Sequence, residues 1–297
     1  MDRSDLAKRM KEYEKASQRY LTRRMPILLR LDGCHFHNFT KKFKRPFDEV
    51  LIKSMQETTK YLCENIQGAT LGYCQSDEIT ILLVDYKNLD SSAWFDNRQN
   101  KIESVAASMC TMAFNKFFRK NAENYIQNCA TDYETQGLCG EGTVEYELCS
   151  AYKKAIDIGA YFDCRAFNIP KEDVTNNFYW RQLDCSRNSI QMVGQANFSH
   201  KELHKKTCNM IQDMLMTQKG INWNNLPTYQ KRGSCVIKEE YWVEKSSGEE
   251  YSEEYSVVLN RLGGGGNDVK RSRWIVDKEI PIFKGEGREY IEKLINF

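Results

Sequence analysis

The sequence predicts an α+β fold in which a β-sheet is flanked by helices. Residues 26–29, together with Leu31, form an apolar run that ends at Asp32-Gly33, a turn signal, and this pattern predicts a buried strand. Residues 69–73 and 79–84 are rich in β-forming side chains and are separated by a few polar residues, which predicts a hairpin. Segment 47–65 between them is helical in character. A strand, a crossing helix and a hairpin in this order can form one sheet.

Two acidic stretches lie at the ends of these strands. Asp32 follows the first strand, and Asp77 and Glu78 lie at the predicted hairpin tip. If the strands are neighbours, Asp32 and Asp77 converge, and two such carboxylates cannot stay charged side by side without a cation. With the carbonyl of Gly33 they offer only oxygen ligands, which suits Mg²⁺ and leaves positions open for phosphates. Together the stretches predict a site for phosphoryl or nucleotidyl transfer, although each alone is typical of an ordinary turn.

The composition is that of a globular protein. Its 297 residues can hold one large domain or two small ones, and 41% apolar content is enough for a core. The net charge is only +2, so any nucleic-acid surface must be local. The first residues are charged and no apolar run approaches the roughly 18 residues of a membrane helix, so we expect a cytoplasmic protein that contacts no membrane. Eleven cysteines without a Cys-x-x-Cys pair indicate neither a zinc site nor a disulfide framework.

A basic loop follows the first acidic stretch. It carries four cationic residues: Lys41, Lys42, Lys44 and Arg45. Positive charge at this place can neutralise a triphosphate held by metal ions, although a solvated charge run explains four such residues equally well. His35 and His37 precede these residues, and we expect hydrogen-bonding roles for both rather than metal ligation.

Further elements follow along the chain. Residues 4–24 predict an amphipathic lead-in helix, and residues 101–120 a helix that covers one face of the sheet. Residues 121–150 are polar and contain three glycines, so we expect a long excursion there. Strand 158–167 carries a third acid, Asp163, for which a role at the metals and an edge position remain equally open.

Two more helices are predicted over 171–195 and 199–218. Trp180, Leu183 and Arg187 share a face of the first helix, so a ring and a cation could serve a nucleotide, with core packing of the tryptophan as the alternative. His200 and His204 have the spacing of a metal pair in the second helix but lack a third ligand, which favours a plain helix surface.

The composition changes at Glu239. Seven glutamates between 239 and 254 indicate an acidic hairpin-like insert, and Gly263 to Gly266 a hinge. A final strand over 274–283 and a short helix over 286–296 follow. We therefore expect a catalytic domain over residues 1–238, and over 239–297 an acidic insert and a C-terminal tail that packs on that domain.

Taken in order, the motifs resemble those of the tRNA-histidine guanylyltransferase superfamily. They are Arg30-Leu31-Asp32-Gly33 with Phe36-His37, Pro46 and Asp48, then Gln75-Ser76-Asp77-Glu78, and then Trp180-Arg181-Gln182 before Asp184 and Asn188. The resemblance covers roughly residues 20–240. It implies a polymerase-palm-like (ferredoxin-like) antiparallel sheet flanked by helices, assembled as a homotetramer, in an enzyme that adds nucleotides to tRNA 5′ ends in the 3′ to 5′ direction.

The resemblance also implies the roles of individual residues. Two Mg²⁺ ions would be held by Asp32, Asp77 and the carbonyl of Gly33, with Asp32, Asp77 and Glu78 as the catalytic acids and ATP and GTP as substrates. The expected nucleotide-binding residues are Arg30, Phe36, His37, Asn38, Lys44, Arg45 and Ser76. The expected RNA-binding residues are Trp180, Arg181, Arg187 and Asn188.

One departure from the family's pattern bears on the substrate. Guanylyltransferases that read the histidine anticodon usually carry His-Ile-Asn-Asn where this chain has Ser186-Arg187-Asn188-Ser189. The chain therefore looks like the guanylyltransferase-like branch, which repairs truncated tRNA 5′ ends with the opposite strand as template. Three alternatives stay open: a dedicated enzyme that adds G at position −1 of histidine tRNA, a nucleotide cyclase that shares the palm but would carry a Gly-Gly-Asp-Glu-Phe signature, and a non-catalytic RNA-binding palm, which would be expected to have lost an acid.

Overall fold

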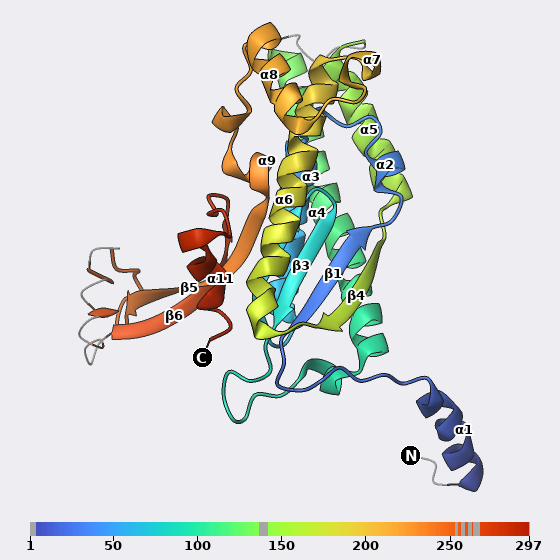
Figure 1. Cartoon of the computed structure of the whole chain (residues 1–297), viewed down its shortest axis with the longest axis vertical. Helices are drawn as coiled ribbons and strands as arrows, with labels where there is room; N and C mark the ends of the chain where they lie inside the picture. The colour runs from blue at the N-terminus through green and yellow to red at the C-terminus, as the bar shows by residue number, and fades with distance from the viewer. Residues whose placement is uncertain are drawn as a thin grey trace.

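The core of the molecule is a six-stranded antiparallel sheet with strand order β4-β1-β3-β2-β5-β6 (Figure 1). The computed structural model describes residues 4–136, 142–252, 255–256, 259–260, 263 and 268–296. The strands are β1 (Ile27–Gly33), β2 (Ala69–Gln75), β3 (Glu78–Leu83), β4 (Phe162–Asn168), β5 (Ser234–Glu244) and β6 (Asp268–Asp277). β1 and β2 both run antiparallel to β3, so they are parallel to each other, and helix α3 (Glu49–Asn65) makes the crossover that a parallel pair requires. The predicted α+β class, with an antiparallel sheet flanked by helices, is confirmed.

Three helices cover one face of the sheet. They are α3, α4 (Gln99–Gln136) and α5 (Val144–Ile158). Because strand side chains alternate between faces, Ile27, Leu29 and Leu31 of β1 all point to this layer, where each is at most 2% exposed. Phe114 and Phe118 of α4 stack within the same cluster. This apolar layer fixes the register of β1, since a shift by one residue would bury Arg30 and Asp32 instead.

Helix α6 (Lys171–Asn197) and the C-terminal segment cover the opposite face. Leu28 of β1 packs there with Val174 and Phe178 of α6 and with Phe283 and Ile291 from the end of the chain. The expected division at 238/239 falls inside β5, and part of the segment after it lies in this second core cluster. A separate domain over 1–238 therefore stays a prediction.

The remaining elements are short helices around the sheet. They are α1 (Asp5–Ala16), α2 (Phe36–Phe39), η1 (Trp94–Asn97), α7 (His200–Leu203), α8 (Cys208–Lys219), η2 (Trp223–Asn225), α9 (Thr228–Arg232), η3 (Gly285–Arg288) and α11 (Glu289–Glu292). Helix α1 stands away from the sheet, and the β5–β6 hairpin extends as an arm from the other side (Figure 1).

Several predicted elements are wrong in their extent. The lead-in helix predicted over 4–24 ends at Ala16, and the final strand predicted over 274–283 ends at Asp277. The long excursion over 121–150 is mostly helix, because α4 continues to Gln136 and α5 begins at Val144, where Thr143 accepts a capping hydrogen bond; residues 137–141 lie outside the described part. The single helix over 199–218 is two helices, since Lys205 has a φ of 59° and interrupts the helical backbone between α7 and α8.

Side chains of α4 complete the outer edge of β4. The amide of Ala166 donates to Glu103 at 2.9 Å, its carbonyl accepts from Gln99 at 3.0 Å, and the amide of Phe162 donates to Thr111 at 3.1 Å. Backbone groups that an edge strand would otherwise present to solvent are thus paired.

Two expectations about composition can be checked in the described residues. All ten cysteines there carry free thiols, and the eleventh, Cys139, lies outside the described part. None of the described helices is both long and apolar enough to cross a membrane.

Candidate active site

The end of β1 and the tip of the β2–β3 hairpin lie side by side. Asp32 is the register partner of Glu78, the first residue of β3. Ser76 and Asp77 form the tip, and Ser76 has a φ of 48°. The amide of Gly33 donates a hydrogen bond to the carbonyl oxygen of Asp77 at 3.1 Å. The predicted metal-binding residues Asp32, Gly33 and Asp77 are therefore together at one end of two adjacent strands.

Asp77 lies where its negative charge is disfavoured. Burial raises the pKa of this carboxyl, and the charges of Asp32 and Glu78 raise it further, while a hydrogen bond from the side chain of Ser76 lowers it. A cation between Asp32 and Asp77 would offset this repulsion.

The donors available at this place fit a hard cation. Among the described residues no group of three or more His, Cys, Asp or Glu side chains converges as a metal cluster. The protein thus offers two carboxylates and the Gly33 carbonyl, and water or phosphate oxygens would complete the shell. Mg²⁺ commonly binds proteins through one or two carboxylates together with substrate phosphates, so the donor set fits it.

A cavity of about 420 Å³ opens beside Asp77, and Asp32 is not among the residues that line it. Six residues of the predicted catalytic and nucleotide sites line it: Phe36, His37, Lys44, Arg45, Ser76 and Asp77. Seven further lining residues were not predicted as site residues: Thr40, Phe43, Pro46, Asp48, Leu51, Met192 and Gln195. Asn38 and Arg30 are not among the lining residues, since Asn38 lies exposed on α2 and Arg30 points into an ion-pair network. Six of the thirteen lining residues are thus among the predicted site residues, whose roles stay predictions.

Asp48 fixes the basic loop against the cavity. This buried carboxylate accepts hydrogen bonds from the amide of Lys44 at 3.0 Å, from the amide of Leu51 at 2.9 Å and from the hydroxyl of Tyr152 at 2.7 Å. It caps α3 and at the same time holds the backbone of Lys44. An aspartate directly before a helical pattern is a capping signal, and that signal could have identified it.

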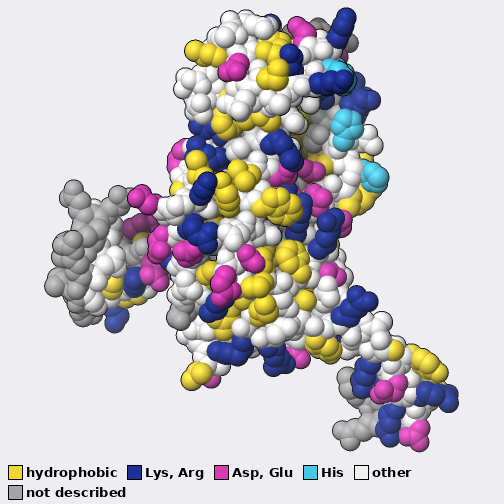
Figure 2. All heavy atoms as spheres, viewed as in Figure 1, with side chains coloured by type: hydrophobic (Ala, Val, Ile, Leu, Met, Phe, Trp, Pro, Cys, Tyr) yellow, Lys and Arg dark blue, Asp and Glu magenta, His cyan; other side chains and the backbone are white. Residues whose placement is uncertain are grey.

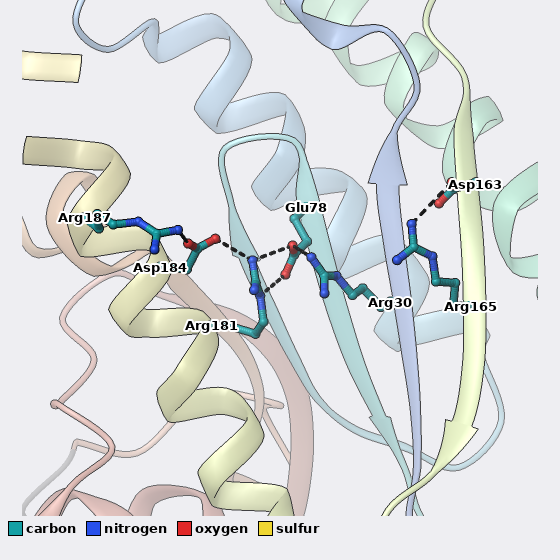
Figure 3. Close-up of polar contacts among 7 residues, drawn as sticks. All are labelled: Arg30, Glu78, Asp163, Arg165, Arg181, Asp184 and Arg187. Carbon is teal, nitrogen blue, oxygen red and sulfur yellow. Dashed lines mark hydrogen bonds and ion pairs between the residues drawn. The ribbon is translucent and has the colours of Figure 1, made fainter. Parts of the chain in front are cut away.

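Glu78 is at the centre of a buried ion-pair network (Figure 3). Its carboxylate accepts hydrogen bonds from Arg181 Nε at 2.7 Å, from Arg181 Nη2 at 2.8 Å and from Arg30 Nη2 at 2.6 Å. Arg181 also donates to Asp184 at 2.7 Å, and Asp184 pairs with the exposed Arg187. Glu78, predicted as a catalytic acid, thus accepts hydrogen bonds from both Arg30, predicted to bind nucleotide, and Arg181, predicted to bind RNA.

The ring of Trp180 covers this network from the solvent side. The guanidinium carbons of Arg181 and Arg30 lie 4.5 Å and 5.8 Å from the ring centroid, and Trp180 is 54% exposed. Core packing of this tryptophan, the alternative at the sequence level, is therefore not what the structure has.

The segment Ser186–Ser189 presents two of its four side chains to solvent. Arg187 and Asn188 are exposed, as an RNA contact would require. The hydroxyl of Ser186 donates to the carbonyl of Lys231 at 3.0 Å, and Ser189 accepts from the indole of Trp223 at 2.9 Å. The hydroxyl groups of both serines are therefore hydrogen-bonded to other parts of the protein.

A second, basic cavity of about 520 Å³ adjoins the first and shares Arg45 and Gln195 with it. Its other charged or titratable lining residues are His200, His204, Lys205 and Lys206, and no acid of the described part of the chain lines it. Figure 2 shows histidine, Lys and Arg side chains together over the region of α7 and α2. A plain helix surface was expected for the two histidines. Both side chains are exposed, as expected, but the helix ends at Leu203, so His204 lies just outside it.

Asp163 lies next to the predicted metal site. It is the register partner of Asp32 on β4, and its half-exposed side chain lies 4.0 Å from Arg165. Spacing along the sequence could not have brought it there, because the pairing of β4 with β1 joins segments far apart in the chain.

Comparison with known proteins identifies the relatives of this chain. The family model described as tRNAHis guanylyltransferase matches residues 7–170. The uncharacterized protein R259 of Acanthamoeba polyphaga mimivirus is 28% identical over 241 residues, covering 78% of this chain and 76% of that protein. The tRNA(His) guanylyltransferase of Saccharomyces cerevisiae is 26% identical over 226 residues, covering 71% of this chain and 82% of that protein.

Solved structures give a similar result. A bacterial tRNA(His) guanylyltransferase (Thg1)-like protein in complex with ATP has 39% identity and a TM-score of 0.71, with 98% of this chain and 99% of that chain covered. Such a protein in complex with GTP has 37% identity and a TM-score of 0.69, with 99% and 100% covered. The resemblance inferred from the motifs is therefore confirmed, and this chain belongs to the tRNAHis guanylyltransferase family of nucleotidyltransferases.

Proposed function

We propose that this enzyme adds nucleotides to the 5′ end of tRNA in the 3′ to 5′ direction, using the opposite strand as template. The observation that carries the proposal is the cavity in which Asp77, next to Asp32, faces the basic residues Lys44 and Arg45. Acids that can hold metal ions and cations that can hold phosphates are what transfer of a nucleotidyl group requires.

The proposed chemistry has two steps. In the first, an oxygen of the tRNA 5′-monophosphate attacks the α-phosphorus of ATP or GTP, a new P–O–P bond forms, and pyrophosphate leaves. In the second, the 3′-hydroxyl of an incoming nucleoside triphosphate loses its proton and attacks the activated 5′ phosphorus, and the nucleoside monophosphate leaves. Mg²⁺ ions, when bound by Asp32, Asp77 and the Gly33 carbonyl, would supply charge neutralisation on the phosphates in both steps.

The side chains of the cavity have separate tasks in this scheme. Lys44 and Arg45 bind the triphosphate, and Asp48 holds the backbone of Lys44 in place. The basic cavity with Lys205 and Lys206 provides a place for further phosphates next to the first cavity. Solvent-exposed Trp180, Arg187 and Asn188 contact RNA, with the indole ring as a stacking surface.

Template-directed repair is favoured over a dedicated histidine-tRNA role by the segment Ser186–Ser189. Both serine hydroxyls are engaged with other parts of the protein, so this segment presents no imidazole and no free hydroxyl for reading an anticodon base. Watson–Crick pairing with the acceptor strand would then select the nucleotide, and the protein would need only the shape and phosphates of the RNA.

The assembly and location of the enzyme are part of the same proposal. A homotetramer and a cytoplasmic location, expected from the sequence, are checked by analytical ultracentrifugation and by cell fractionation.

The experiment that tests the proposal is incubation of the protein with 5′-truncated tRNA, Mg²⁺ and each labelled nucleoside triphosphate in turn. Products that are longer at the 5′ end are expected, and they should appear when the nucleotide complements the template base. The absence of any 5′ extension, with folded protein and every nucleotide supplied, would exclude the proposed activity.

A further inference from the structure

The carboxylate of Glu78 has most of its hydrogen-bonding capacity committed to two arginines. Three charge-assisted hydrogen bonds of 2.6–2.8 Å reach its two oxygens, and the side chain is 7% exposed. Of the roughly four lone-pair sites of a carboxylate, these bonds occupy three, and a metal ion at the remaining one would be repelled by two guanidinium charges. Glu78 therefore differs from its neighbour Asp77, which lies at the cavity wall.

The two arginines connect Glu78 to the surface. Arg181 is held on one side by Glu78 and on the other by Asp184, and its side chain is 6% exposed. The ring of Trp180 lies against both guanidinium groups and leaves about half of its surface to solvent. A base stacked on the open side of this ring would rest on a surface whose back is fixed by the ion pairs that Figure 3 draws among Arg30, Glu78 and Arg181.

Glu78 also connects to the residues expected to bind metal. It follows Asp77 directly in the chain, and it is the register partner of both Asp32 on β1 and Gln75 on β2. The position of its carboxylate thus constrains the hairpin tip from inside the sheet. Arg30 Nε and the hydroxyl of Thr80, the register partner of Arg30 on β3, are buried and have no hydrogen-bond partner among the described residues.

We propose that Glu78 is a positioning residue, not a metal ligand: through Arg181 and Arg30 it ties the stacking surface of Trp180 to the hairpin tip that carries Asp77. The identity of the stacked group as a base of the RNA or of the incoming nucleotide rests on the proposed function. The assignment of Glu78 rests only on its contacts. Loss of the Glu78–arginine ion pairs shifts a group stacked on Trp180 relative to the hairpin tip, while the carboxylates of Asp32 and Asp77 remain in place to bind metal.

The test separates metal binding from turnover. Mn²⁺ binding to the RNA-free protein is measured by electron paramagnetic resonance for the wild type, Glu78→Gln, Arg181→Lys and Asp77→Asn. We expect Asp77→Asn to weaken Mn²⁺ binding at least about tenfold, and the other two variants to change it less than about threefold. In 5′-extension assays Glu78→Gln and Arg181→Lys should lower kcat by about tenfold or more, with little change in the KM for nucleoside triphosphate.

The double variant Glu78→Gln/Arg181→Lys gives the second readout. If the two residues act as one unit, the kcat of the double variant should be close to that of the single variant with the lower kcat. A product of the two single effects would overturn the proposal, and so would loss of Mn²⁺ binding in Glu78→Gln as large as that in Asp77→Asn. If Glu78→Gln fails to fold, Arg181→Lys decides: unchanged kcat would contradict the proposal, and reduced kcat with Mn²⁺ binding retained would support it. Because the titration uses no RNA, it tests Glu78 even if the wild type fails to extend tRNA.

Discussion

Gly33 donates its amide hydrogen to the carbonyl of Asp77 at 3.1 Å, and this bond joins the end of β1 to the tip of the neighbouring hairpin. It places the carboxylate of Asp32, one residue earlier, next to that of Asp77. The two carboxylates therefore repel each other. Burial raises the pKa of Asp77, and the negative charge of Asp32 raises it further. The consequences for activity and stability can be measured.

Replacing either acid should abolish nucleotide addition. Asp32→Ala and Asp77→Ala each remove half of the carboxylate charge available to the metal ions, so we expect less than about a tenth of the wild-type rate with the fold intact. Extension assays with circular dichroism on the same samples measure both properties. Asp90→Ala, on an exposed loop away from the cavity, is the matched control and should keep full activity. Folded Asp32 or Asp77 variants that retain more than a tenth of the rate would contradict the assignment.

Neutralising the cavity lysine and arginine should affect nucleotides more than RNA. In Lys44→Gln/Arg45→Gln the Kd for nucleoside triphosphate should rise by about tenfold, and the Kd for tRNA by less, because both residues line the cavity beside Asp77. The difference should shrink at high salt. Lys41→Gln/Lys42→Gln is the control, since these two exposed residues of the same loop do not line the cavity. Equal losses for nucleotide and tRNA would make the loop a general RNA surface.

A methyl group on Gly33 should disturb the cavity wall. A Cβ at this position would overlap the ring of Phe36, which is itself packed against Phe39, Phe114 and Phe162. Gly33→Ala should therefore lower the free energy of unfolding by about 1–3 kcal/mol, as overpacking does elsewhere. Urea unfolding measures this change. The double variant Gly33→Ala/Phe36→Leu should recover part of the loss, and no recovery would show that crowding by Phe36 is not the cause.

The ionisation of Asp77 should destabilise the protein in the absence of metal. A carboxyl with a raised pKa binds its proton more tightly in the folded state, so its contribution to stability is present at low pH and is lost as pH rises through the folded-state pKa. At about pH 7, Asp77→Asn should thus have a higher Tm than the metal-free wild type, and the difference should narrow toward about pH 4. Thermal unfolding with and without Mg²⁺ checks this. Mg²⁺ should raise the Tm of the wild type much more than that of the variant, and a lower Tm for the variant in metal-free buffer would refute the argument.

The choice of tRNA should follow the template base. Ser186 and Ser189 are bonded to Lys231 and Trp223, so we expect extension of 5′-truncated tRNAs of several identities, each with the nucleotide that complements its template base. The assay compares these tRNAs with the template base varied. If only histidine tRNA is extended, and a changed anticodon stops the reaction, the enzyme is a dedicated histidine-tRNA guanylyltransferase.

Local sequence patterns predicted the centre of the fold well. β1, α3 and the hairpin have strong periodicity and clear turn signals, and the two acids follow from where those strands end. The extension of α4 was missed because its outer face is polar and three glycines lie beyond it. The spacing of Phe118, Ala122 and Cys129, all buried, continues the helical stripe and could have revealed it.

The environment of Glu78 could not have been predicted in the same way. Its partner Arg181 is 103 residues away in the chain, and they meet only because α6 docks across the face of the sheet. The basic cavity depends likewise on a break at Lys205 that helix periodicity does not register. The parts of the site that sequence patterns did not predict thus depend on the docking of α6 on the sheet and on the helix break at Lys205.

Three side chains of α4 form hydrogen bonds with the backbone at the outer edge of β4. These bonds also affect how two molecules of this protein can associate. A strand from another molecule could add to β4 only by displacing Gln99, Glu103 and Thr111 from their backbone partners. Such addition is the first step of edge-to-edge aggregation, and here it is opposed by three existing hydrogen bonds. The strand that carries Asp163, directly beside Asp32, is therefore protected from self-association at the side of the sheet closest to the site.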